Sequence, residues 1–179
     1  DGSTTGDNNI AIGFNSMMSV TTGTQNISIG STSLDAMTTA DNNTCLGHNT
    51  MSSVTTGGSN TAIGAFALDA NTTASNNTAV GVDALGANTT GTNNVAVGAN
   101  ALDANTTSSD NTAVGLSSLT NSTGSSNTAL GFQAGANVTS ASNNVFLGRD
   151  AGVTGSPGGN ITTSGGVLCI GDENISAAH

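Results

Sequence analysis

Residues Asn77–Thr107 read NTAVGVDALGANTTGTNNVAVGANALDANTT, and within this segment Asn77-Thr78-Ala79-Val80-Gly81 returns in register as Asn94-Val95-Ala96-Val97-Gly98. One unit is approximately x-N-N-T-A-V-G-x-x-A-L-x-A-N-T-T-G; we number its positions one to seventeen from Asp7 and call each unit a coil. The glycine at position seven marks the unit along the whole chain. It recurs at this constant spacing at Gly13, Gly30, Gly47, Gly64, Gly81, Gly98 and Gly115; Gly131 comes one position early, Gly148 restores the spacing, and Gly171 follows a longer interval.

The content of the unit favours β-structure. Thr, Asn, Gly and Val dominate it, and no apolar residues recur at the spacing of a helix face. The T-A-V segment is typical of a short strand, and the following Gly permits a tight corner. We expect the Leu or Met at position eleven to anchor a second short strand, with turns at the Asn-Asn and Asn-Thr-Thr-Gly stretches. The sequence therefore predicts an all-β, parallel β-solenoid of about ten coils, a rod roughly 50 Å long at about 4.8 Å per coil.

The repeat also divides the chain. Residues 1–6 form an N-terminal lead-in, and residues 7–148 form the regular coils. Residues 149–166 are predicted to be a Gly-rich loop that contains the only proline, Pro157. Residues 167–179 complete a terminal coil and a tail.

Two ladders of large apolar residues are the predicted interior. Position six holds Ile12, Ile29, Leu46, Ile63, Val80, Val97, Val114, Leu130, Leu147 and Ile170; position eleven holds Met17, Leu34, Met51, Leu68, Leu85, Leu102 and Leu119. Position five is small except at Phe146, and neighbouring residues of a strand point to opposite faces. Small residues on the outside would let another chain approach, which indicates a homo-oligomer; small residues inside a very thin coil are the alternative.

Position three is Asn in every regular coil. Stacked at strand spacing, such amides are expected to hydrogen-bond from coil to coil, which is a structural role and not a ligand site. The residues are Asn9, Asn26, Asn43, Asn60, Asn77, Asn94, Asn111, Asn127 and Asn144.

The charge balance and the residue inventory exclude several functions. The net charge is -10 and Arg149 is the single Lys or Arg, so nucleic acid and anionic membranes are not expected partners. His48 has no Cys or His at ligand spacing, and no nucleophile elbow or phosphate loop is present, which predicts a non-enzymatic protein without metal or cofactor. Cys45 and Cys169, seven coils apart, are expected to be unbridged apolar fillers.

Arg149 begins the irregular C-terminal region. In register it shares its position with Asp172 of the next coil, and Asp150 and Glu173 lie alongside. We therefore predict an ion pair that joins Arg149 to Asp172 and Asp150.

Threonines at positions fifteen and sixteen raise ice binding as an alternative function, because flat Thr ladders can order water. Adjacent residues of a strand point in opposite directions, so only one of these two ranks can face outward. The double T-x-T rank expected of an ice-binding face is missing from these positions.

The segment Asn77–Thr107 resembles the repeats of phage tail-fibre proteins, and it is similar to the head repeats of trimeric autotransporter adhesins, which form a left-handed parallel β-roll. The likeness extends from Asp7 to Gly148. Residues 148–179 resemble the segment that precedes the intramolecular chaperone domain of such fibres, which implies that the chain is a fragment or a self-cleaved product. The resemblance further implies a parallel homotrimer whose rolls pack around a common axis.

These observations predict a structural and adhesive segment of a trimeric phage tail fibre, located extracellularly on the virion. It would be a rigid rod that projects, or that presents a surface to a host receptor or glycan. Residues that break the repeat are the candidate receptor contacts, and a scattered exposed or interchain apolar contact is the alternative role: Phe14, His48, Phe66 and Phe132. A head segment of a bacterial surface adhesin and an ice-binding solenoid remain alternatives.

Overall fold

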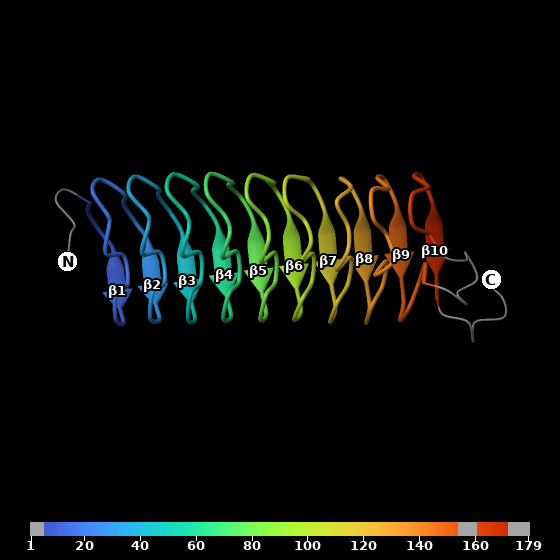
Figure 1. Ribbon diagram of the computed structural model, residues 1–179, viewed down its shortest axis with the longest axis horizontal. Helices are drawn as coiled ribbons and strands as arrows, with labels where there is room; N and C mark the ends of the chain where they lie inside the picture. The colour runs from blue at the N-terminus through green and yellow to red at the C-terminus, as the bar shows by residue number, and fades with distance from the viewer. Residues whose placement is uncertain (1–5, 154–160, 172–179) are drawn as a thin grey trace.

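The computed structural model describes residues 6–153 and 161–171, which form one parallel β-solenoid. Ten three-residue strands occur in this part of the chain: β1 (Ile10–Ile12), β2 (Ile27–Ile29), β3 (Thr44–Leu46), β4 (Thr61–Ile63), β5 (Thr78–Val80), β6 (Val95–Val97), β7 (Thr112–Val114), β8 (Thr128–Leu130), β9 (Val145–Leu147) and β10 (Leu168–Ile170). Each strand pairs in parallel with its neighbours in the sequence, and β1 and β10 lie at opposite ends of the rod (Figure 1). The predicted fold class is confirmed.

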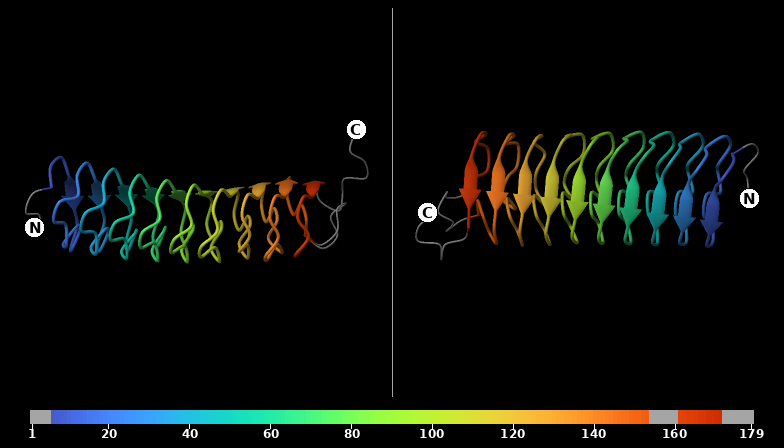
Figure 2. Two further views of the ribbon diagram at one scale, coloured as in Figure 1. Left: turned by 90° about the horizontal axis from the view of Figure 1, so that it is seen from above. Right: turned by 180° about the vertical axis from the view of Figure 1, so that it is seen from behind.

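The register of the sheet places like residues on like residues. Ile63 pairs with Val80, and Val80 pairs with Val97. The interval before the last strand is longer than one repeat. Cys169 nevertheless pairs with Phe146 at the same position of the coil. One sequence repeat therefore corresponds to one winding of the chain, with the strands stacked along one long side of the rod (Figure 2).

The predicted second strand at position eleven is wrong. Among the described residues each coil has one strand, and position eleven lies in a turn with a left-handed backbone, as at Met51 (φ 51°) and Leu68 (φ 52°). Positions two and nine are left-handed as well, for example Asn76 (φ 62°) and Asp83 (φ 55°). Three such residues per coil turn the chain through its corners. Coil-to-coil bonds such as Leu68 N–H to Ala84 O (3.0 Å) still join these turns.

The prediction that position six lines the interior is also wrong. Leu46 is 47% exposed, whereas Cys45 beside it is fully buried. Position five points inward and is buried in every coil after the first; Ala11 of the first coil is exposed because it lines the open end of the rod. Position eleven is buried as predicted. The coil is thin, and a Leu opposite an Ala already fills it. Small residues inside a thin coil, the alternative reading, are therefore what the structure contains.

The Asn ladder at position three is confirmed. Asn60 is representative: its Nδ2 donates to Asn43 Oδ1 (3.1 Å) and to Ala74 O (2.9 Å), and its Oδ1 accepts from the backbone N–H of Asn77 (2.9 Å). The ladder thus carries the backbone hydrogen bonds around a corner where no strand exists.

A second Asn ladder inside the rod was not anticipated. Position fourteen is apolar in the first three coils and becomes a buried Asn in the next three: Asn71, Asn88 and Asn105. Asn105 Nδ2 donates to Asn88 Oδ1 at 3.0 Å. The Asn-Thr-Thr stretches, which the sequence indicates only as turns, therefore also supply hydrogen bonds to the core.

The glycine at position seven is required by space. At Gly81 the backbone has φ 138°, and an added β-carbon would lie 2.6 Å from the carbonyl carbon and oxygen of Gly98. Only glycine allows the corner that ends each strand to stack on the next corner.

Candidate interaction surface on the sheet

The most distinctive surface of the rod is the outer sheet face, which we define as the side chains at positions four and six of the ten strands. Position six is the aliphatic ladder given above. None of the outward residues of the described strands is buried and none is charged. Position four holds Ile10, Ile27, Thr44, Thr61, Thr78, Val95, Thr112, Thr128, Val145 and Leu168.

The local sequence explains why this face is apolar and continuous. Side chains alternate across a strand, so when Ala79 points into the coil, Thr78 and Val80 must both point out. Pairing in register then aligns position four with position four and position six with position six in each neighbouring strand. The result is two parallel ranks of mainly β-branched side chains along the rod.

Acidic residues lie outside this face. Asp35, Asp69 and Asp103 occupy position twelve, and Asp41 occupies position one. Asp41 is held in its turn, because its Oδ1 accepts from the backbone N–H (2.7 Å) and the hydroxyl (2.9 Å) of Thr24. Among the described residues the negative charge is therefore carried by the turns, and the sheet face stays neutral.

One carboxyl group has a perturbed acidity. Burial raises the pKa of Asp103 above its ordinary value, and the negative charge of Asp83 raises the pKa further. Both effects disfavour the carboxylate. The Asp103 carboxyl therefore holds its proton more tightly than an ordinary aspartic acid.

The four candidate receptor contacts lie at positions eight and nine, directly after the strands, and the structure does not gather them into one cluster. Phe14 is 74% exposed in the first coil. His48 and Phe66 form an edge-to-face pair with ring centroids 5.6 Å apart. Phe132 instead lies beneath Arg149, whose guanidinium carbon is 5.7 Å from the ring centroid. The candidates therefore form two separate ring contacts, with Phe14 apart from both.

Arg149 forms one of its two predicted ion pairs. Its Nε lies 3.0 Å from Asp150 Oδ2, so the contact with Asp150 is confirmed. The predicted pair with Asp172 lies outside the described residues.

The two Thr ranks of the turns differ in hydrogen bonding more than in exposure, since Thr21 and Thr106 at position fifteen are also exposed. At position fifteen the hydroxyl donates to the carbonyl of the next coil, for example Thr38 Oγ1 to Thr55 O (3.2 Å) and Thr89 Oγ1 to Thr106 O (2.9 Å). Position sixteen is exposed, as at Thr73 and Thr90. The turns therefore present a single rank of free threonines.

The sheet carries two adjacent outward ranks, but these pair Thr with an aliphatic residue and are not the T-x-T double rank. In β3, β4, β5, β7 and β8 an outward Thr at position four is followed by an outward aliphatic residue at position six. This arrangement does not follow from the sequence-based prediction, in which position six lines the interior.

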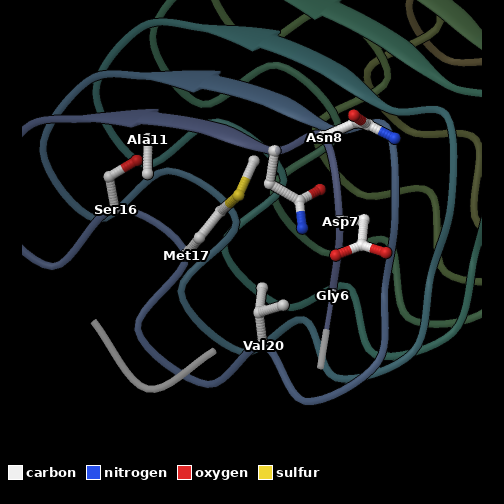
Figure 3. A pocket seen from close by; sticks show the side chains of 8 residues that line it. Gly6, Asp7, Asn8, Ala11, Ser16, Met17 and Val20 are labelled. Carbon is white, nitrogen blue, oxygen red and sulfur yellow. The ribbon is translucent and has the colours of Figure 1, made fainter. Parts of the chain in front are cut away.

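A hollow of about 440 Å³ opens at the N-terminal end of the rod (Figure 3). It is lined by residues of the first coil, including Asn9, Ala11, Met17 and Val20. The same positions fill the interior of the following coils. The hollow is therefore the uncovered end of the core, and it gathers no set of catalytic groups.

The remaining candidate groups are dispersed. Cys45 and Cys169 are free and buried, as expected of apolar fillers. Within residues 6–153 and 161–171, no three His, Cys, Asp or Glu side chains lie close enough to hold a metal ion. The same residues contain no helix of the length and hydropathy needed to cross a membrane.

Comparison with protein-family models, with curated proteins and with solved structures finds no match for this chain.

Proposed function

We propose that this chain is a rigid structural segment of a homotrimeric fibre of the phage tail-fibre type, which projects or presents a surface to a host cell. The observation that carries the proposal is the outer sheet face, which is uncharged along all ten described strands. A head segment of a bacterial surface adhesin would share this architecture and remains the alternative setting.

The outer sheet face is an apolar surface that we expect another molecule to cover. Soluble monomers rarely expose a large contiguous apolar patch. Here Ile10 and Ile12 are 50% and 57% exposed at one end, and Leu168 is 64% exposed at the other, with aliphatic residues in every strand between them. Removing these side chains from water favours association.

A second copy of the same chain is the partner that fits the outer sheet face best. The ranks repeat at the strand spacing of about 4.8 Å, and a second copy has the same spacing over the same length. Two chains of net charge -10 repel each other through their turns, and the neutral sheet face is where they can approach. Three sheets around one axis would bury three such faces together.

The hydrogen-bond ladders of the rod support a mechanical role. Backbone ladders and the Asn ladder run through the described coils, so bending the rod would break many hydrogen bonds at once. The edge residues His48, Phe66 and Phe132 remain available beside the covered sheet as contacts for a receptor or glycan.

The test is the mass of the purified chain in solution, measured by light scattering on a size-exclusion column. We expect three times the 17.2 kDa of one chain. The variant Val80→Lys/Val97→Lys places two charges on the outer sheet face and is expected to be monomeric. Its matched control, Thr73→Lys/Thr90→Lys, adds the same charges at exposed turns and should remain trimeric. A wild-type chain that stays monomeric at tens of micromolar would contradict the proposal.

Ice binding is the second candidate, and the Thr-x-aliphatic rank of the outer sheet face favours it. The hydroxyl and methyl groups of Thr61, Ile63, Thr78 and Val80 repeat on a regular grid. This function requires the face to be open to water, so it predicts a monomer with thermal hysteresis. A trimer without hysteresis would exclude it.

A further inference from the structure

The outer sheet face is not uniform along the rod. At position four the first two strands carry Ile, and the last two carry Val145 and Leu168, whereas five of the six strands between them carry Thr. We define the N-terminal band as Ile10, Ile12, Ile27 and Ile29, and the C-terminal band as Val145, Leu147, Leu168 and Ile170. The strands between them form the central band.

The central band cannot by itself align two copies. Successive strands β4 and β5 present Thr-x-Ile and Thr-x-Val, which are nearly the same surface. A neighbouring copy that slips by one coil would meet an almost identical rank. Slippage of this kind is the known weakness of repetitive strands without distinctive residues.

The two end bands are distinctive. Each band has an aliphatic residue at position four as well as at position six of both of its strands, and the bands include the two most exposed of these side chains, Ile12 at 57% and Leu168 at 64%. A slip of one coil uncovers one strand of the N-terminal band on one copy and one strand of the C-terminal band on the other. It also sets some of the remaining end-band residues against threonines of the central band. Hydrophobic burial is therefore greatest when the ends are flush.

We propose that the N-terminal and C-terminal bands set the register of neighbouring copies of this chain, so that copies lie flush and in parallel with the same residues facing each other. This inference rests on the proposed homotrimer, and it assigns the alignment to named residues. The central band adds adhesion without selecting a register.

The experiment uses a reporter thiol in the middle of the face. Thr78→Cys in β5 would be the only accessible thiol, since Cys45 and Cys169 are 0% and 1% exposed. Oxidation with copper phenanthroline should give covalent dimers through residue 78, with at most two of the three chains of a trimer linked. A mixture of Thr78→Cys and Thr61→Cys chains reports slippage by one coil, and its mixed dimers should be scarce.

Two variants then test the bands by replacing aliphatic side chains of the outer sheet face with Thr. In the end variant, Ile10, Ile27, Val145 and Leu168 are each changed to Thr. In the matched central variant, Ile63, Val80, Val97 and Val114 are changed to Thr. We expect the end variant to lower the yield of dimers through residue 78 several-fold and to raise the mixed dimers, while the central variant keeps the wild-type pattern.

The outcomes separate the two proposals. A wild-type chain that is monomeric by light scattering overturns the homotrimer, and the register inference falls with it. A trimer whose mixed 61–78 dimers equal its 78–78 dimers overturns the register inference alone, and this measurement does not depend on the end variant folding. Loss of register in the central variant but not in the end variant would overturn it as well.

Discussion

The phenyl ring of Phe146 occupies the space that a side chain at Gly152 would fill. A β-carbon on Gly152 would overlap the ring, and one on Gly135 would lie 2.9 Å from Phe146 Cδ2. Phe146 stands at position five, where other coils have Ala, Ser or Cys, and the two glycines stand at position eleven, where other coils have Leu or Met. In the coil of Phe146 and Gly152 the large and the small residue have exchanged sides.

This exchange can be tested by reversing it. Phe146→Ala should lower the free energy of unfolding by about 3–5 kcal/mol, because it leaves a cavity in the core. Gly152→Leu alone should also destabilise the fold, because the ring occupies the site. The double variant should recover part of the loss, since Leu takes a similar left-handed backbone at this position in other coils, as at Leu119 (φ 49°). Urea unfolding of all four proteins measures the coupling, and strictly additive effects would argue against it.

The Asn ladder gives a second prediction. Asn60→Ala removes the acceptor of the buried Asn77 N–H, whereas Ala74 O loses one donor and keeps Asn71 Nδ2. A buried polar group left without a partner costs about 1–3 kcal/mol, so we expect a loss of that size in the free energy of unfolding.

The control for Asn60→Ala is Asn76→Gly. Asn76 is exposed and has φ 62°, which glycine tolerates. Its stability should stay within about 0.5 kcal/mol of the wild type. Equal losses in both variants would mean that the amide stack contributes nothing beyond the backbone.

The repeat predicts the register of every described strand, because the same short motif ending in the position-seven glycine marks each strand even where the interval changes. It does not say which side of the strand is inside. The larger residues of an alternating strand are usually the buried ones, and that expectation placed Val80 inside and Ala79 outside. Each coil is too thin to hold two large residues. Leu85 occupies the interior, so only a small residue fits opposite it.

The surface that we propose as the interface could have been recognised from position four. Thr61 and Thr78 share a face with Ile63 and Val80 because, in each strand, the two outward residues lie either side of one inward residue. A rank that mixes Thr with Val and Ile suits a half-exposed surface. By contrast, the pairing of Phe146 with Gly135 and Gly152 depends on which positions oppose each other across a coil, and the linear sequence does not contain that geometry.

Asp103 gives a prediction for pH. Its folded pKa is raised by burial and then by Asp83, so the folded chain binds this proton more tightly than the unfolded chain. The stability due to this group is therefore complete in acid, below the unfolded pKa, and is lost as the pH rises through the folded pKa. Asp103→Asn should raise the thermal midpoint at pH 7 and leave it unchanged near the acid limit, as measured by circular dichroism.

The neighbour of Asp103 supplies the check. Asp83→Asn removes the charge but not the burial, so the pKa of Asp103 should fall toward its ordinary value without reaching it. Carbon-detected NMR titration of the Asp103 carboxyl follows this directly. A pKa of Asp103 that is the same in wild type and Asp83→Asn would show that burial alone raises it.

Cys45 gives the last prediction. It is fully buried, its Sγ lies 3.2 Å from Met51 Sδ, and burial raises the pKa of the thiol far above its usual range, with a smaller opposing effect from the side chain of Ser33. Since the thiolate is the reactive form, Cys45 in a Cys169→Ala background should react with a thiol reagent only when the rod opens, at least about a hundredfold more slowly than an exposed thiol. Thr90→Cys, on an exposed turn of a chain without the native cysteines, is the matched exposed thiol. Urea below the unfolding midpoint should accelerate the labelling of Cys45 and leave the labelling of Thr90→Cys nearly constant. Complete labelling of Cys45 within seconds in a folded rod would place the thiol outside the core.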